Sequence, residues 1–205
     1  MDYTKLLVLD TETTGLNDAW NDEAIELAIV DWEGNTLFNQ RFKPEAKIHP
    51  KAQEVHGIAA EDLADCPIWA DAEDEIKAML ADRPLVIFNA DFDLNIMLTS
   101  ALSRRTLANG SFEDMTNWVT ALRFHSYCAM YWAADVFGAT NSYGTISLAN
   151  AVKEAGIKWQ GNPHSAEGDA LTTLALVKEM LRRGSEFPET MEHDIEENRK
   201  RLLGE

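Results

Sequence analysis

Four carboxylates and one histidine lie in three short motifs, each placed where an apolar run gives way to polar residues. Asp10 and Glu12 follow the first apolar run, and the third carboxylate is Asp93. The fourth, Asp169, comes five residues after His164. Carboxylate oxygens suit hard divalent cations, and a neighbouring histidine suits the base that an activated water requires. We therefore interpret these five side chains as one metal site.

The first motif carries two of the acids on one strand. Asp10 and Glu12 are two residues apart at the end of a predicted strand, so their side chains point to the same face. Two carboxylates on one face repel each other unless a cation lies between them. The Thr13-Thr14-Gly15 sequence that follows predicts a sharp turn, whose backbone N–H groups suit a phosphate or a terminal hydroxyl. A bare Asp-x-Glu is more often a helix cap and a surface acid, but this context favours the metal site.

The second motif contains two acids that need different assignments. Asp91 lies closer to the end of a predicted strand, so we assign it to helix capping or to solvent. Asp93 lies early in the following helix, where the macrodipole also favours acids, and we assign it to the metal site.

The third motif combines the remaining acid with the histidine. On a continuous helix a separation of five residues would place His164 and Asp169 on different faces. Gly161 and Pro163 predict instead that His164 lies on a loop, from which its side chain can reach the metals. A second histidine, His56, either lines a substrate pocket or caps a turn.

Composition restricts the class of protein. The chain has 205 residues, 45% hydrophobic content and a formal charge of 18 − 35 = −17, which argues against a large phosphate-binding surface. No apolar stretch reaches the length of a membrane span, and the N-terminus lacks a signal-peptide pattern. The two cysteines, Cys66 and Cys128, have no C-x-x-C spacing. We expect a cytoplasmic protein without membrane association.

The elements that must position the motifs follow from hydrophobic periodicity. We predict strands at 6–9, 24–32, 36–42, 85–88 and 118–124. We predict helices at 68–81, 91–103, 126–137, 147–155 and 166–183. Loops are predicted at 106–117, 138–144 and 161–163. This order predicts an α/β layer structure with a mixed sheet, in which a hairpin-linked first half is followed by crossovers. We predict one domain at 1–183 and a charged C-terminal helix or tail at 184–205.

The three motifs together resemble those of the DEDDh (DnaQ-like) 3′→5′ exonuclease family. The matching segments are 9–16, 89–93 and 164–169, with a further likeness at 55–58. The similarity runs from about residue 5 to about residue 183. One departure is Phe88 before Asn89 and Ala90, where many relatives have histidine, and the segment 104–144 matches less clearly.

The resemblance implies a fold, a cofactor and roles for particular residues. The fold is ribonuclease-H-like, with three layers and a mixed five-stranded sheet flanked by helices. Two Mg²⁺ or Mn²⁺ ions are implied, held by Asp10, Glu12, Asp93 and Asp169. One ion activates water, His164 takes its proton, and the second ion stabilises the leaving 3′ oxygen. The implied substrate-binding residues are Thr13, Thr14, Gly15, Leu16, His56, Asn89 and Phe92.

By this resemblance we expect a metal-dependent exonuclease that hydrolyses single-stranded 3′ ends of DNA or RNA and releases nucleoside 5′-monophosphates. One alternative is an RNA-trimming enzyme of the ribonuclease T or oligoribonuclease type. Another is a non-catalytic, polymerase-associated binding subunit, although the complete set of acids argues against a loss of catalysis. A homodimer or a polymerase partner is compatible with each of these readings.

Overall fold

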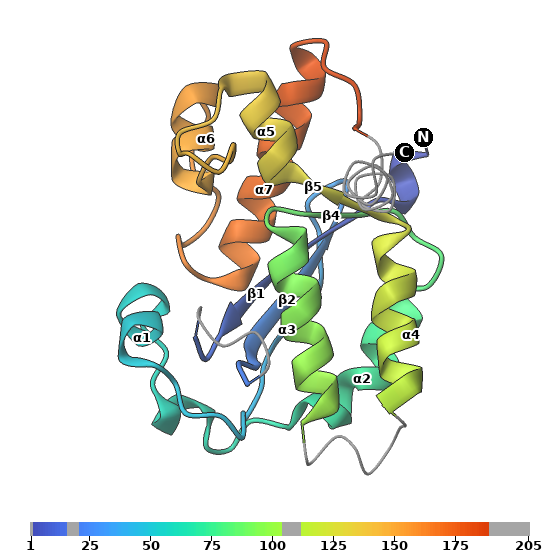
Figure 1. Cartoon of the computed structure of the whole chain (residues 1–205), viewed down its shortest axis with the longest axis vertical. Helices are drawn as coiled ribbons and strands as arrows, with labels where there is room; N and C mark the ends of the chain where they lie inside the picture. The colour runs from blue at the N-terminus through green and yellow to red at the C-terminus, as the bar shows by residue number, and fades with distance from the viewer. Residues whose placement is uncertain (1, 16–20, 104–111, 189–205) are drawn as a thin grey trace, which may run out of the picture.

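The computed structural model describes residues 2–15, 21–103 and 112–188. Within them one sheet has the strand order β3-β2-β1-β4-β5 (Figure 1). The strands are β1 Leu7–Thr13, β2 Ala24–Asp31, β3 Thr36–Arg41, β4 Leu85–Ile87 and β5 Ser126–Cys128. Strand β2 is antiparallel to β1 and β3, whereas β4 is parallel to β1 and β5. The predicted mixed five-stranded sheet is confirmed.

Helices cover both faces of the sheet and complete three layers (Figure 1). Their bounds are α1 Pro50–His56, α2 Trp69–Leu80, α3 Ala90–Leu102, α4 Phe112–Arg123, α5 Ala129–Phe137, α6 Leu148–Ala155 and α7 Ala166–Arg182. Short 3₁₀ turns occupy Tyr3–Lys5 and Ala60–Leu63. One hydrophobic cluster joins the sheet to α2, α3 and α4, and a second joins it to α5, α6 and α7.

Strand β1 belongs to both clusters because its side chains alternate. Leu7 and Leu9 pack with α2, α3 and α4, whereas Val8 packs with α5, α6 and α7. The same alternation carries Asp10 and Glu12 to the α7 side of the sheet. The residue between them, Thr11, faces α3. The polar side chains at the end of β1 therefore point toward both helical layers.

Most of the predicted elements are confirmed. The strands predicted at 24–32, 36–42 and 85–88 match within one residue at each end, as do the helices predicted at 68–81, 91–103, 147–155 and 166–183. The first strand continues past the predicted residue 9 to Thr13. Gly156 adopts φ 70° beyond α6, as expected for a glycine that ends a helix.

The strand predicted at 118–124 is wrong, because these residues lie in and just beyond α4. Met115, Val119 and Leu122 are buried at helical spacings of four and three residues, which turns them toward the sheet together. Residues 112–117, predicted as a loop, also belong to this helix, while 104–111 lie outside the described residues. The fifth strand is instead Ser126–Cys128, so the helix predicted from residue 126 begins at Ala129.

The end of the described chain packs on the domain. Arg183 caps α7, and Phe187 lies within ring-contact distance of Tyr3, Tyr127 and Trp132. Residues 189–205, which make up most of the predicted tail, lie outside the described residues. None of the described helices combines the length and apolar content that a membrane span needs.

Candidate active site

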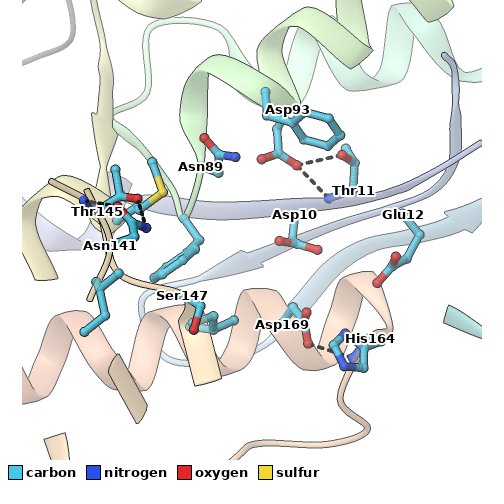
Figure 2. Close-up of a pocket in the computed structure, with 15 residues that line it drawn as sticks. Asp10, Thr11, Glu12, Asn89, Asp93, Asn141, Thr145, Ser147, His164 and Asp169 are labelled. Atoms are coloured by element: carbon cyan, nitrogen blue, oxygen red, sulfur yellow. Dashed lines mark hydrogen bonds between the residues drawn. The ribbon is translucent and has the colours of Figure 1, made fainter. Parts of the chain in front are cut away.

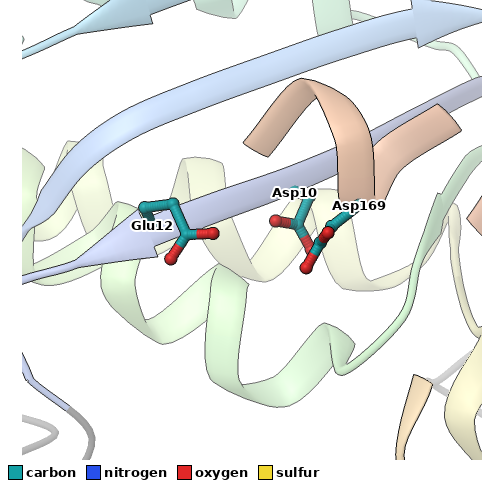
Figure 3. Close-up of side chains that lie close together, drawn as sticks. All are labelled: Asp10, Glu12 and Asp169. Atoms are coloured by element: carbon teal, nitrogen blue, oxygen red, sulfur yellow. The ribbon is translucent and has the colours of Figure 1, made fainter. Parts of the chain in front are cut away.

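Three of the predicted acids meet on the α7 side of the sheet. One carboxylate oxygen from each of Asp10, Glu12 and Asp169 lies within 4.8 Å of the others (Figure 3). Asp10 and Glu12 come from β1, and Asp169 comes from the first turn of α7 (Figure 2). The alternation of side chains along β1 thus places Asp10 and Glu12 on the same face of the sheet, as predicted. Helix α7, which covers that face, supplies Asp169.

A network that the sequence analysis did not identify holds the start of α7. The Ser165 hydroxyl accepts a hydrogen bond from the Gly168 N–H at 3.2 Å. Buried Glu26 accepts the Ala166 N–H at 2.9 Å through Oε2, while its Oε1 accepts Arg41 Nε at 2.9 Å. Glu26 lies opposite Glu12 on the neighbouring strand, so one β2 residue connects the helix to the strand that carries Asp10 and Glu12.

His164 lies on a tightly turned loop, as predicted, and borders the same cavity. Its backbone adopts φ 61°, an uncommon left-handed conformation for a residue other than glycine. Its N–H donates to Asp169 Oδ1 at 3.1 Å, so the acid fixes the loop that carries the histidine (Figure 2). A Cβ at Gly168 would lie 2.0 Å from the Asn162 carbonyl oxygen, so only glycine allows this loop to close on the helix.

Asp93 reaches the site from the opposite layer. Its Oδ1 accepts hydrogen bonds from the Thr11 N–H at 3.1 Å and from the Thr11 hydroxyl at 2.6 Å (Figure 2). The side chain lines the same cavity as the other acids but is not part of the 4.8 Å group. Asp91, by contrast, is exposed and pairs with Arg123, as befits the solvent role assigned to it.

Burial raises the pKa of all four acids, and the charges of neighbouring carboxylates add to this for Asp10, Glu12 and Asp93. Burial, followed by the charges of Asp169, Glu26 and Asp93, raises the pKa of Glu12 to about 8. Burial and the same kind of repulsion raise the pKa of Asp10 well above its usual value, and burial raises the pKa of Asp93 and of Asp169. Ionised together, these groups need a positive charge between them. The all-oxygen donor set and its spacing therefore fit hard divalent cations.

The predicted substrate-binding residues separate into two groups. Asn89 and Phe92 line the cavity. The hydroxyls of Thr13 and Thr14 are instead engaged inside the protein, with the Gly15 carbonyl and with Asp22.

Among the remaining members of this set, Gly15 and His56 are not part of the cavity lining. Gly15 is buried so close to Asp22 that a Cβ would lie 2.5 Å from the carboxylate oxygen. His56 accepts the Ile58 N–H at 3.0 Å through Nδ1, while its buried Nε2 has no hydrogen-bond partner among the described residues. Leu16 lies outside the described residues.

The cavity has a second wall that the sequence analysis did not identify. The site has a volume of about 410 Å³, within the range of ~300–1,000 Å³ usual for ligand pockets. The unpredicted lining residues are Thr11, Phe88, Met130, Asn141, Thr145, Ile146, Ser147 and Leu148. Four of these eight residues, Asn141, Thr145, Ile146 and Ser147, belong to the segment that connects α5 to α6. The available signal was a polar, glycine-containing loop directly before a serine-capped helix.

Comparison with known proteins gives matching results at the levels of sequence and fold. A family model described as "Exonuclease" matches residues 7–177. An uncharacterized exonuclease of Escherichia phage 186 is 29% identical over 182 residues, which cover 87% of this chain and 89% of that protein. The DNA polymerase III epsilon subunit of Salmonella typhimurium is 39% identical over 102 residues, covering 46% of this chain and only 42% of the subunit.

Solved structures share the fold. Exonuclease X in complex with 5′ overhanging duplex DNA has a TM-score of 0.62 and 24% identity, covering 91% of this chain and 98% of that one. The nuclease domain of 3′hExo, a DEDDh family member bound to rAMP, has a TM-score of 0.65 and 14% identity, covering 93% and 98%. The predicted ribonuclease-H-like fold is confirmed. Because the family model spans most of the chain, the protein belongs to the exonuclease family, as its resemblance to DEDDh nucleases predicted.

Proposed function

We propose that the protein is a metal-dependent 3′→5′ exonuclease that removes nucleoside 5′-monophosphates from single-stranded ends. The observation that carries the proposal is the group formed by Asp10, Glu12 and Asp169, whose carboxylate oxygens lie within 4.8 Å of one another on a cavity of about 410 Å³. A cavity of this size suits a terminal nucleotide better than a long duplex.

Each acid has a role in this proposal. Asp10, Glu12 and Asp169 would hold divalent cations, with Asp93 completing the set from the α3 side. When bound, a pair of Mg²⁺ or Mn²⁺ ions supplies Lewis acidity for phosphodiester hydrolysis. Thr11 orients Asp93 through two hydrogen bonds to Oδ1, and Oδ2 accepts neither of them.

His164 acts as the general base in this proposal. Its exposed side chain borders the cavity, and its backbone is held by Asp169. A histidine changes charge near neutral pH and can therefore accept a proton from an attacking water and release it to solvent. Asn89 and Phe92, on the α3 side, contact the sugar and base of the departing nucleotide.

The test is digestion of labelled single-stranded DNA, duplex DNA and short RNA side by side with Mn²⁺. We expect single nucleotides to be released from the 3′ end, EDTA to stop the reaction, and Mg²⁺ or Mn²⁺ to restore it. Faster digestion of RNA would favour the RNA-trimming alternative, because contacts to the 2′-hydroxyl distinguish the two nucleic acids. Binding without hydrolysis under all of these conditions would support the non-catalytic subunit instead.

Partners and location complete the proposal. The chain matches about half of the length of the polymerase III epsilon subunits, 42% in Salmonella typhimurium and 55% in Rickettsia typhi, so a polymerase partner is to be tested by gel filtration with candidate polymerases. The same experiment without them tests a homodimer. We place the protein in the cytoplasm, where a reducing environment suits its two free cysteines.

A further inference from the structure

Tyr143 is the most exposed large hydrophobic side chain among the described residues, at 87%. Large aromatic side chains bury much apolar area when they find a contact, so leaving one in solvent forgoes that stabilisation. The other exposed aromatic side chains of the described chain reach at most 46%. An aromatic ring displayed in this way is suited to a contact with another molecule.

The loop that carries Tyr143 is held by internal hydrogen bonds. Asn141 Oδ1 accepts the N–H groups of Tyr143 at 2.9 Å and Thr145 at 3.2 Å, and Asn141 Nδ2 donates to the Thr145 hydroxyl at 2.7 Å. The Thr140 N–H donates to the Thr145 carbonyl at 2.9 Å, and Gly144 turns the chain at φ 76°. The ring is therefore presented on a constrained turn, which reduces the entropy lost when it binds.

This turn borders the proposed active site. Asn141 and Thr145, on either side of Tyr143, both line the cavity. Figure 2 shows them on one side of Asp10, with Glu12 and His164 on the other side. Because the cavity extends from Glu12 and His164 to Asn141 and Thr145, a strand bound across the acids passes this turn at one of its ends.

The chemistry of the wall favours bases over phosphates. Phe88, Met130, Ile146 and Leu148 give it an apolar surface, and no lysine or arginine is among the described residues that line the cavity. In a chain of net charge −17, attraction of the phosphate backbone contributes little at this site. Stacking on an aromatic ring is the usual alternative, because every base has a π-face.

We propose that Tyr143 stacks on a nucleobase upstream of the scissile phosphate and so selects unpaired strands. The inference rests on the proposed exonuclease function and names the element that recognises the substrate. A base inside a duplex is already stacked and paired, so it would have to lose those contacts in order to stack on the tyrosine ring. Single-strand preference then arises at the exit of the cavity, apart from the acids.

The test combines Tyr143→Ala with abasic sites. Fluorescence anisotropy measures the Kd of a labelled oligothymidylate that carries phosphorothioate linkages at its 3′ end, with one upstream base removed at a time. We expect wild-type protein to lose about 5- to 150-fold in affinity at one position. Tyr143→Ala should bind the intact strand more weakly than wild type by the same factor, and removing the base at that position should not weaken its binding further. Tyr143→Phe and Tyr143→Trp should bind like wild type.

Two controls separate this inference from the proposed function. Phe124→Ala removes another exposed aromatic ring and should leave the affinity unchanged. Phe124 lies just before β5, whose first residue, Ser126, pairs with Leu85 at the end of β4 opposite to Phe88 of the cavity. Hydrolysis of thymidine 5′-monophosphate p-nitrophenyl ester, which has no upstream base, should be the same for Tyr143→Ala and wild type.

The outcomes point in different directions. The stacking role would be overturned if Tyr143→Ala bound the intact strand as tightly as wild type. It would also be overturned if an abasic site reduced the affinity of Tyr143→Ala and of wild type by the same factor. If the wild type hydrolysed neither the ester nor an oligonucleotide, the exonuclease proposal would be overturned. The affinity measurements with abasic strands would still decide whether Tyr143 stacks on a base.

Discussion

At the scale of single residues, the site is defined by carboxylates that destabilise one another until a cation binds. Burial and repulsion by neighbouring carboxylates, Glu26 among them, raise the pKa of Asp10 and of Glu12, and burial raises the pKa of Asp169. Residues arranged for function in this way commonly lower the stability of the free protein. The two effects are separable by measuring stability and activity on the same variants.

Asp10→Asn should abolish hydrolysis and stabilise the metal-free protein by about 0.5–2 kcal/mol, because the amide has no charge to bury. Urea denaturation in EDTA measures the free energy of unfolding, and the nuclease assay measures activity. Asp169→Ala should also be inactive. Full activity in either variant would refute the metal assignment.

Asp93→Asn and Asp91→Asn form a matched pair two residues apart. Asp93 is buried and accepts both Thr11 hydrogen bonds, so its substitution should reduce activity by at least about 100-fold. Asp91 is exposed and pairs with Arg123 at the surface, so its loss should cost no more than about 1 kcal/mol of stability and little activity. Steady-state kinetics on one oligonucleotide compares the two, and the reverse order would mean that the second motif is misassigned.

At the scale of elements, the start of α7 sets the position of His164, the proposed base, relative to the acids. The loop before the helix closes on Gly168, and Asp169 binds the backbone of His164. Ser165 and Glu26 satisfy two of the free N–H groups of the first turn. The position of the His164 loop thus depends on Gly168, which has no reactive side chain of its own.

Gly168→Ala should lower kcat by about 10- to 100-fold, because the added methyl group displaces the loop that carries His164. His164→Ala should lower kcat sharply with little loss of metal binding, measured by calorimetry. The double variant should be no slower than His164→Ala, since both substitutions act on one group. Additive losses would show that Gly168 acts on something other than the histidine.

At the scale of the whole molecule, the acid group links folding to pH and to metal. The pKa of Glu12 is about 8 in the folded protein and 4.5 for an unperturbed glutamate, so the folded state binds more protons between these values. Stability therefore falls as pH rises through this window, because deprotonation is easier in the unfolded chain. A bound cation opposes the loss by stabilising the ionised form.

Urea denaturation of the metal-free protein at pH 5, 6.5 and 8 should accordingly show a decreasing free energy of unfolding. Added Mg²⁺ should reduce the decrease, and the reduction should be largest at pH 8, where the carboxylates compete least with protons. Asp10→Asn serves as the control and should show a shallower dependence. A metal-free stability that increases with pH across this range would contradict the assigned electrostatics.

Local sequence determined much of this protein. Alternation along a strand predicted that Asp10 and Glu12 share a face, and the glycine and proline near His164 predicted its loop. The periodicity of apolar residues located most helices and strands to within one residue. These features depend on neighbours within a few positions, which a sequence displays directly.

Only the tertiary structure decided the rest. Asp93 reaches the cavity from the far layer through Thr11, Glu26 connects β2 to α7, and the α5–α6 segment forms the wall that presents Tyr143. The helix at 112–123 is a different case, because the helical spacing of Met115, Val119 and Leu122 is present in the sequence but crosses the boundary between the predicted loop and the predicted strand. The other features are contacts between residues far apart in the chain, and local periodicity carries no information about which layers meet.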